Sequence, residues 1–256
     1  MMTHKLSPVA YAVSQQNLYA TAQKVSSPAP SSSKFSITER FQFLADFAKM
    51  VATKQANSLL VTGKGGLGKT YTVSKAIKGA DTIVIKGYST AKALYRTLYE
   101  NRSKVVVFDD CDSILQDKKA INILKAALDT YETRTVTWGS DVIGSDLPRS
   151  FDFTGAIIFI SNMHQDSIDQ AIRSRALCVD LAMTDAEKIE RMVEIGRNPE
   201  FMPEYPLNTK FEALKLISAN LDKIDNLTVR TLIEITKIAS TGGAWVRKAE
   251  YLLQMV

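Results

Sequence analysis

The sequence predicts an α/β protein in which helices sandwich a five-stranded parallel sheet, followed by a small all-helical domain. Five short runs of apolar, mostly branched residues are the expected strands, at 58–62, 82–85, 105–108, 156–160 and 176–181. Continuous apolar runs of this length are typical of strands buried on both faces of a sheet. Helical patterns separate the runs, and this alternation favours a parallel sheet. After Leu181 only helical patterns follow.

The chain is expected to have three parts: a tail (1–35), an α/β domain (36–182) and a helical lid domain (183–256). The tail contains a Ser- and Pro-rich stretch that buries little surface, which predicts flexibility. The first helix is expected over 36–55, where Ser36 and Glu39 form a capping-box pattern. Its wide apolar stripe indicates packing on the α/β domain, with a subunit contact as the alternative. Further helices are expected at 91–98, 121–131, 184–195, 211–224, 228–240 and 244–255, with Thr184 and Glu187 as a second capping box.

The composition excludes several classes of protein. Cys111 and Cys178 are the only cysteines, and His4 and His164 are the only histidines, which is too few for a disulfide scaffold or a zinc site. No apolar run reaches the roughly 18–20 residues that cross a bilayer, and the first residues contain no secretory signal. A cytoplasmic protein without membrane contact is therefore expected. The net charge of +5 permits contact with nucleic acid but does not require it, because Lys and Arg are scattered.

A glycine-rich stretch, "VTGKGGLGKTYTV" at 61–73, lies between an expected strand and an expected helix. It contains the pattern G-x-x-x-x-G-K-[ST], which in this context predicts a phosphate-binding loop. Glycines allow the backbone to turn its N–H groups inward, and with the helix N-terminus these donors bind phosphate. We expect Lys69 to reach the β- and γ-phosphates of a nucleotide and Thr70 to bind Mg²⁺. The candidate nucleotide-binding residues are Gly63, Lys64, Gly65, Gly66, Leu67, Gly68, Lys69, Thr70 and Tyr71.

Two acids at the end of the run 105–108 predict the second half of this site. Parallel strands place Asp109 and Asp110 at the sheet edge where the phosphate loop begins. Asp109 is expected to hold Mg²⁺ through its water shell, and Asp110 to orient and polarise an attacking water. The alternative for Asp110 is a helix-capping or surface acid. Asp112 is expected to cap the following turn, and Cys111 to contribute packing rather than chemistry.

With these motifs the chain resembles the AAA+ ATPases, in which "GKGGLGKT" and "VVVFDD" would be the Walker A and Walker B motifs. "IIFISN" at 157–162 is similar to the sensor 1 strand, which implies that Asn162 positions the attacking water. "DQAIRSRALCVDL" at 169–181 is similar to the arginine-finger segment. The match is best for Arg175, with Arg173 second, and implies action at the site of a neighbouring subunit. "LTVRTL" at 227–232 is similar to sensor 2, which implies that Arg230 lies over the nucleotide.

The resemblance covers 36–256 and implies an ATP- and Mg²⁺-dependent hydrolase that forms a homo-oligomer, expected as a hexameric ring. Such a ring would remodel or translocate a macromolecule, either nucleic acid or protein. The similarity is greatest to small phage-encoded members, which implies a place in the host cytoplasm and a role in phage DNA metabolism. The family usually has Glu where this chain has Asp110. The second hypothesis is therefore a nucleotide-dependent assembly switch or loader with little turnover.

Other nucleotide-binding classes fit less well. The chain contains neither the N-K-x-D motif of GTPases nor the L-S-G-G-Q signature of ABC ATPases. A kinase of small metabolites stays an alternative, although it would need neither the terminal helical domain nor the "RSR" segment at 173–175.

Two further segments are candidates for contact with a substrate or a neighbouring subunit. In ring-forming relatives the segment 85–94 lines the central pore, which implies that Tyr88 grips a polymer; the alternative is that Tyr88 packs on the neighbouring helix. The insert 131–155 contains "TRTVTW", which predicts half of a β-hairpin with Trp138 near its tip. Alternatively, Phe151 and Phe153 attach this insert to the core.

Overall fold

The computed structural model describes residues 33–131, 133–139 and 147–255. The tail expected over 1–35 therefore lies outside the described residues except for its last three. The chain divides into an α/β unit, Thr38–Ala182, and a helical unit that begins at Met183. No helix in the described ranges combines the length and the apolar character needed to cross a membrane.

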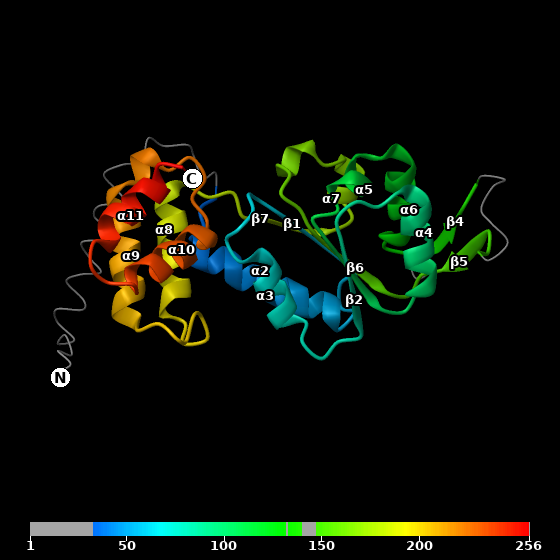
Figure 1. Ribbon diagram of the computed structural model, residues 1–256. Coiled ribbons are helices and arrows are strands. Elements are labelled where there is room, and N and C mark those ends of the chain that lie inside the picture. Colours follow the sequence, from blue (N-terminus) through cyan, green and yellow to red (C-terminus); the bar gives the residue numbers. More distant parts are fainter. Residues whose placement is uncertain (1–32, 132, 140–146, 256) are drawn as a thin grey trace. The chain divides into compact units, whose positions relative to one another are not determined.

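A five-stranded sheet forms the centre of the α/β unit, as the sequence predicts (Figure 1). Its strands are β1 (Ser58–Thr62), β2 (Thr82–Lys86), β3 (Val105–Asp109), β6 (Ala156–Ile160) and β7 (Leu177–Asp180). All neighbouring pairs are parallel, and the spatial order is β2-β3-β6-β1-β7. Parallel strands end at the same edge of a sheet, so residues that follow β1, β3 and β6 are brought together.

The expectation that every strand is buried on both faces is wrong for β2. The three central strands, β1, β3 and β6, are buried along their whole length. β2 lies at the edge of the sheet, and the side chain of Val84 in its middle is 47% exposed. An apolar run of branched residues does not by itself distinguish an edge strand from a central one, because both positions favour these residues.

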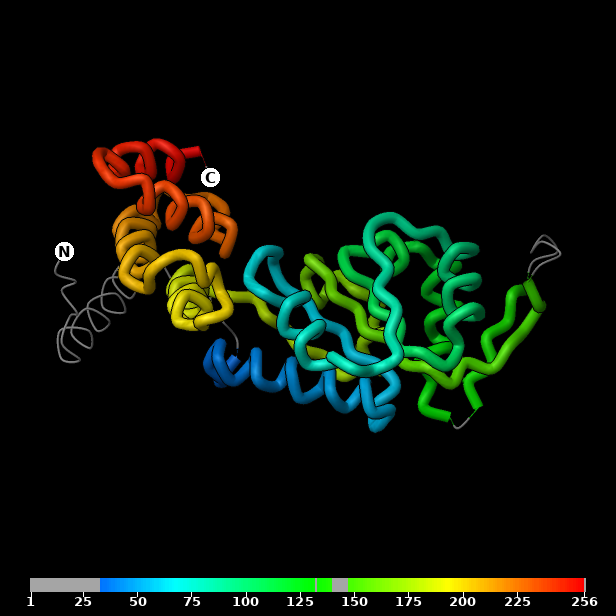
Figure 2. Tube along the Cα trace, turned by 60° about the horizontal axis from the view of Figure 1, so that its bottom comes forward, coloured from blue at the N-terminus to red at the C-terminus, as the bar shows by residue number. Residues whose placement is uncertain are grey.

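Helices cover both faces of the sheet (Figures 1 and 2). They are α2 (Ile37–Ala52), α3 (Lys69–Ala76), α4 (Ala91–Glu100), α5 (Asp112–Gln116), α6 (Lys118–Ala127) and α7 (Gln170–Arg173). On one face, Val106, Phe108 and Phe159 pack with Leu94 of α4 and Leu124 of α6 in one core cluster. The rings of Phe108 and Phe159 stack with their centroids 5.5 Å apart. The alternation of side chains along each strand places the remaining sheet residues toward α2 and α3.

The insert between α6 and β6 contains a short antiparallel hairpin, as "TRTVTW" predicts. Its strands are β4 (Thr135–Thr137) and β5 (Ser150–Asp152). Aromatic contacts attach it to α4: the ring of Tyr95 lies 5.5 Å from that of Trp138 and 5.1 Å from that of Phe151. Phe151 and Phe153 are buried, so their expected attachment to the core is confirmed. The part of the insert at 132 and 140–146 lies outside the described residues.

A buried arginine joins this hairpin to the rest of the domain. The guanidinium of Arg134 donates to the main-chain oxygens of Ala127, 2.9 Å, and Gly155, 2.6 Å. It also lies over the ring of Phe153. Burial lowers the pKa of Arg134. Gly155 is required beside it, because a Cβ atom there would overlap the main-chain oxygen of Lys104 and approach the Phe153 ring to 3.0 Å.

The second unit is helical, with α8 (Asp185–Arg197), α9 (Leu207–Ala219), α10 (Val229–Ala239) and α11 (Trp245–Leu253). The capping box of Thr184 and Glu187 is present at the start of α8. The helix expected over 211–224 instead spans Leu207–Ala219 and is followed by a 3₁₀ turn at Leu221–Lys223. Pro206 precedes its first turn, and Asn220 ends it by donating its side-chain amide to the Leu216 carbonyl.

We expect Gly155→Ala to lower the free energy of unfolding by about 1–3 kcal/mol, because the added methyl group overlaps the Lys104 main chain. Urea denaturation would measure this loss. Gly139→Ala is the matched control, since a Cβ atom at Gly139 meets nothing within 4 Å. Equal stability of the two variants would contradict the close approach at Gly155.

Candidate functional site

Polar side chains gather at the edge of the sheet where β1, β3 and β6 end. The phosphate loop follows β1, and Asn162 follows β6. Asp109 is the last residue of β3, and Asp110 comes directly after it. The register pairs Ile160 with both Val61 and Asp109, so the three strands end level. β6 lies between β1 and β3, and this order places Asn162 between the loop and the two acids.

The backbone of the loop requires glycine at several positions. Gly63, Gly66 and Gly68 have φ values of 125°, 81° and 96°, in the region that side chains disfavour. A Cβ atom on Gly63 would lie 2.8 Å from the main-chain carbonyl of Leu181, which directly follows β7. A Cβ atom on Gly65 would lie 3.3 Å from Asn162 Oδ1. The loop is thus held tightly against its neighbours and leads directly into the N-terminus of α3 at Lys69.

The ammonium group of Lys69 is buried and held by neutral oxygens. Its Nζ donates to the carbonyl of Gly63, to the carbonyl of Lys64 at 3.0 Å and to Asn162 Oδ1 at 2.8 Å. Burial lowers the pKa of Lys69, and the negative charges of nearby Asp110, Asp112 and Asp109 oppose this shift. Within the described residues, no carboxylate lies at ion-pair distance from Nζ. A buried cation in this position gains free energy from a bound anion.

Asp109 and Thr70 are in direct contact, so their oxygens are close enough to bind one metal ion. The Thr70 hydroxyl donates to Asp109 Oδ1 at 2.9 Å, and the Asp109 carboxylate is almost completely buried. No group of three or more His, Cys, Asp or Glu side chains that could hold a metal alone occurs among the described residues. Mg²⁺ bound together with phosphates needs only one or two carboxylates, because water and phosphate oxygens supply the other ligands. The pair therefore fits this metal.

Asp110 and Lys69 are connected through one amide side chain. Asn162 accepts from Lys69 through Oδ1 and donates through Nδ2 to Asp110 Oδ1 at 2.7 Å. Asp110 has a left-handed backbone, φ 57°, and its N–H donates to the Ile160 carbonyl. It does not cap α5, whose N-terminal flanking residue is Cys111. The side chain is exposed and contacts Asn162, which in turn contacts Lys69 of the phosphate loop.

The two residues beside Asp110 have structural contacts. Asp112 is the first residue of α5 and makes no side-chain cap, contrary to the expectation; its Oδ1 accepts from the Ser161 hydroxyl at 2.7 Å. Cys111 is buried in the core, and its Sγ donates to the Ile85 carbonyl. Burial raises the pKa of the Cys111 thiol to about 11, so it stays protonated at neutral pH. This agrees with a packing role for Cys111.

Arg175 lies at the opposite edge of the sheet, whereas the side chain of Arg173 contacts Ile168 and Asp166 in the segment that follows β6. The carbonyl of Arg175 accepts from the hydroxyl of Ser58, the first residue of β1, whereas the phosphate loop follows the last residue. The five residue steps from Ser58 to Gly63, the first residue of the loop, span roughly 16 Å. Arg173 makes an ion pair with Asp166 at 3.5 Å. Arg175 donates to the Ala171 carbonyl and, within the described residues, pairs with neither Asp169 nor Asp180. Among the described contacts, neither arginine side chain is bonded to the phosphate loop of its own chain.

The remaining candidates differ in their surroundings. Leu67 is buried, so it anchors the loop rather than offering its side chain to a ligand. Lys64 is exposed within the loop. Tyr71 is exposed on α3, with the Lys75 ammonium 5.8 Å from its ring centroid. Arg230 is exposed in the first turn of α10, in the helical unit, and its role over a nucleotide stays a prediction.

Sequence reasoning missed one contact of the site, the ion pair between Lys86 and Asp109. Lys86 Nζ lies 3.0 Å from Asp109 Oδ2. β2 and β3 are neighbouring strands, and their register pairs Lys86 with Asp109. This ion pair could be predicted only if the order of the strands were known. The alternative that Tyr88 packs on a helix is wrong, because its side chain is 83% exposed.

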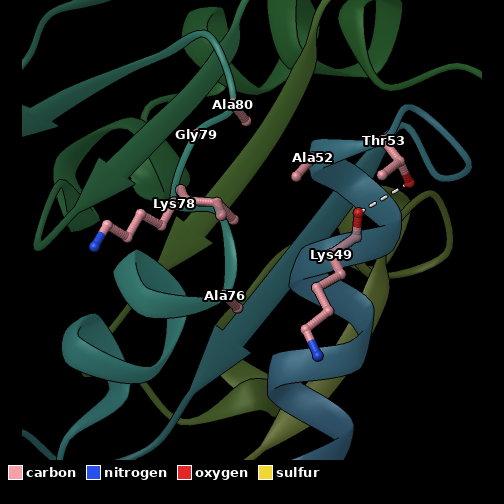
Figure 3. A pocket seen from close by; sticks show the side chains of 8 residues that line it. Lys49, Ala52, Thr53, Ala76, Lys78, Gly79 and Ala80 are labelled. Atoms are coloured by element: carbon pink, nitrogen blue, oxygen red, sulfur yellow. Dashed lines mark hydrogen bonds between the residues drawn. The ribbon is translucent and has the colours of Figure 1, made fainter.

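A hollow of about 300 Å³ lies away from the phosphate loop, between the C-terminal ends of α2 and α3 (Figure 3). It is lined by Lys49, Ala52, Thr53, Ala76, Ile77, Lys78, Gly79 and Ala80. These residues precede β1 and β2, so the hollow is at the edge where the strands begin. The Thr53 hydroxyl already donates to the Lys49 carbonyl. Helix C-termini and two exposed lysines do not make an anion site here.

Comparison with known proteins gives one relative. The chain is 30% identical over 232 residues to an uncharacterized 36.7 kDa protein from the nrdC-mobD intergenic region of Enterobacteria phage T4. The match covers 81% of this chain and 71% of the phage protein. No protein-family model matches the chain.

We expect Lys69→Ala to abolish binding of a fluorescent ATP analogue while the thermal unfolding temperature stays nearly unchanged. The substitution removes the one buried ammonium of the loop and leaves the apolar core intact. Lys78→Ala is the matched control, because Lys78 is an exposed lysine just beyond the other end of α3. Binding of the analogue to Lys69→Ala as tightly as to the control would refute the phosphate-loop assignment.

Proposed function

We propose that this chain, which belongs to the same family as the uncharacterized 36.7 kDa protein of phage T4, is a Mg²⁺-dependent ATPase of the AAA+ type. The observation that carries the proposal is the connected set Lys69, Asn162 and Asp110, with Thr70 and Asp109 beside it. A cation for phosphates, a hydroxyl and a carboxylate for a metal, and a second carboxylate for water are held at one sheet edge. Phosphoryl transfer to water needs these groups together.

Each residue has a defined task in this proposal. The loop N–H groups and Lys69 bind the phosphates of ATP and hold the γ-phosphoryl group in place. Thr70 and Asp109 hold the metal; Mg²⁺, when bound, offsets the charge that develops on the phosphate oxygens. Asp110 orients the attacking water and accepts its proton, while Asn162 positions the water between the loop and Asp110. Asn162 contacts both Lys69 and Asp110 and so lies between them.

The proposed active form is a homo-oligomeric ring, with a hexamer as the expected state. Arg175 supports this, because it is too far from the phosphate loop of its own chain and has no acidic partner among the described residues. The ring would remodel or translocate a nucleic acid or a protein in phage DNA metabolism, in the cytoplasm of the host. Tyr88, exposed at the same sheet edge as the phosphate loop, is the proposed contact with that macromolecule.

Asp110 also favours a second candidate function, a nucleotide-dependent assembly switch or loader with little turnover. Aspartate is one methylene shorter than the glutamate usual in the family, and here its carboxylate is engaged by Asn162. Steady-state ATP hydrolysis, measured with and without DNA or RNA, separates the two functions. Sustained turnover supports the ATPase, whereas tight ATP binding with negligible turnover under all conditions supports the switch.

We expect Asp110→Asn to keep ATP binding and to slow hydrolysis by about 10²-fold or more, since an amide cannot accept the proton of the water. Asparagine tolerates the left-handed backbone at this position, so the fold should be retained. Asp109→Asn should instead weaken Mg²⁺-dependent binding. Asp112→Asn is the control, because Asp112 contacts Ser161 and not Asn162. Normal hydrolysis by Asp110→Asn would show that another group polarises the water.

We expect Arg175→Ala to bind ATP but to hydrolyse it roughly 10³-fold or more slowly, as removal of an arginine finger does in other phosphate-loop enzymes. Arg173→Ala should show a milder loss. Mixing the two inactive variants Arg175→Ala and Lys69→Ala gives the sharper measurement. Each keeps what the other lacks, so mixed rings should regain part of the activity. No recovery on mixing, with assembly confirmed by light scattering, would argue against sites shared between subunits.

A further inference from the structure

The Asp109 carboxylate, proposed above to hold Mg²⁺, already has a cation beside it. Its Oδ1 accepts from the Thr70 hydroxyl, and its Oδ2 lies 3.0 Å from the ammonium of Lys86. The Asp109 side chain is 5% exposed, whereas that of Lys86 is 66% exposed. Lys86 therefore reaches from the surface to a buried negative charge. A divalent ion bound near Asp109 would weaken this ion pair, because it offsets the charge of Asp109 and repels the ammonium.

Two residues after Lys86 comes Tyr88, the most exposed aromatic residue of the described chain. Between them Gly87 has φ 84°, and a Cβ atom there would meet nothing within 4 Å. Gly87 and Tyr88 thus form a turn that is exposed to solvent. Lys86 and Tyr88 are two residues apart at the same edge of the sheet, so a lysine released from Asp109 would be free to act together with this ring.

Both sides of this turn are attached to the segment that follows β3. On one side the Cys111 thiol donates to the Ile85 carbonyl at 3.4 Å, next to Lys86. On the other side Ser89 and Ser113 exchange two hydrogen bonds, from Ser89 N–H to the Ser113 hydroxyl and from that hydroxyl to the Ser89 carbonyl. The flanks are fixed and only the apex is free. A metal at Asp109 would thus alter the side-chain contact of Lys86 without moving these flanks.

The charges around the turn favour an anionic partner. No acidic residue occurs from Thr82 to Tyr99, whereas Lys86, Lys92 and Arg96 lie in this segment, the last of them paired with Glu100 at 3.6 Å. An exposed aromatic ring next to ammonium groups fits a single-stranded nucleic acid, in which a base stacks on the ring and the phosphates meet the cations. An extended polypeptide lacks the negative charge that every nucleotide carries, so it would gain less from a segment without acidic residues.

We propose that Lys86 competes with Mg²⁺ for Asp109, and that its release on binding of Mg²⁺ and nucleotide creates with Tyr88 a contact for single-stranded nucleic acid. This inference rests on the proposed nucleotide site. It names the substrate class and makes Lys86 a positioning residue that links the metal to the substrate. The affinity for nucleic acid would then depend on the nucleotide without any large movement of the domain.

The first test measures metal dependence rather than activity. Binding of a fluorescent ATP analogue is titrated with Mg²⁺ for the parent protein and for Lys86→Met. Removal of the competing ammonium should lower the Mg²⁺ concentration for half-maximal binding roughly two- to fivefold, the range for a partly exposed ion pair. Lys92→Met, an exposed lysine without an ion pair among the described contacts, is the control and should match the parent. An unchanged or increased Mg²⁺ requirement for Lys86→Met would overturn the competition.

The second test measures binding of a labelled single-stranded oligonucleotide with and without Mg²⁺ and a non-hydrolysable ATP analogue. In the parent, the analogue should raise the affinity and steepen the dependence of log K on log salt by about 0.7, the contribution of one added phosphate contact. Lys86→Met should lose this change, and Tyr88→Ala should bind about tenfold more weakly. Equal binding with and without the analogue, or a Tyr88→Ala defect seen only with an unfolded protein, would overturn the assignment.

The two proposals fail in different ways. If the parent does not bind the ATP analogue, or binds it no better than Lys69→Ala, the nucleotide site itself is wrong. If the parent binds the analogue and Lys69→Ala does not, but Lys86→Met behaves as the parent protein in both tests, only the role of Lys86 is wrong.

Discussion

The burial of one ammonium group, that of Lys69, is the constraint on which the candidate site depends. A charge removed from water is stable only when hydrogen-bond acceptors replace its hydration. Here the acceptors are the carbonyls of Gly63 and Lys64 and the amide oxygen of Asn162. Two of the three belong to the loop itself, so the loop must curve around its own lysine. That curvature requires the positive φ angles that only glycine adopts easily.

The order of the strands brings the loop with Lys69 together with Asn162 and Asp110. Because β6 separates β1 from β3, the amide of Asn162 can contact Lys69 on one side and Asp110 on the other. An amide has both an acceptor and a donor, which allows it to connect a cation with an anion. If β1 and β3 were neighbours, Lys69 and Asp110 would lie one strand closer. A direct ion pair between them would then compete with phosphate and with water for the same groups.

Much of the fold and part of the site could be predicted from the sequence, because the signals are local. Branched apolar runs mark the strands, the glycine pattern marks the loop, and the contact of Thr70 with Asp109 follows from parallel strands that end at one edge. What could not be predicted depends on which strands are neighbours. The exposure of Val84 follows from the edge position of β2, and the ion pair of Lys86 from its register with β3. Asp112 was expected to be a capping residue. Its hydrogen-bond partner is instead Ser161, which follows β6 and is far from Asp112 in the sequence.

Arg173, the last residue of α7, and Arg175, in the turn that follows, differ in how completely their side chains are bonded. The charge of Arg173 is paired with that of Asp166 in the same chain, so Arg173 is less available to a neighbouring subunit. Arg175 has only the carbonyl of Ala171, and its buried Nε atom has no hydrogen-bond acceptor within the described residues. A buried donor without an acceptor costs free energy, which a partner that supplies an anion or a carbonyl would recover. One chain therefore carries a phosphate loop at one edge and an incompletely bonded arginine at the other. In the proposed ring these two incomplete halves meet between neighbouring chains, which makes assembly a condition of the chemistry rather than an addition to it.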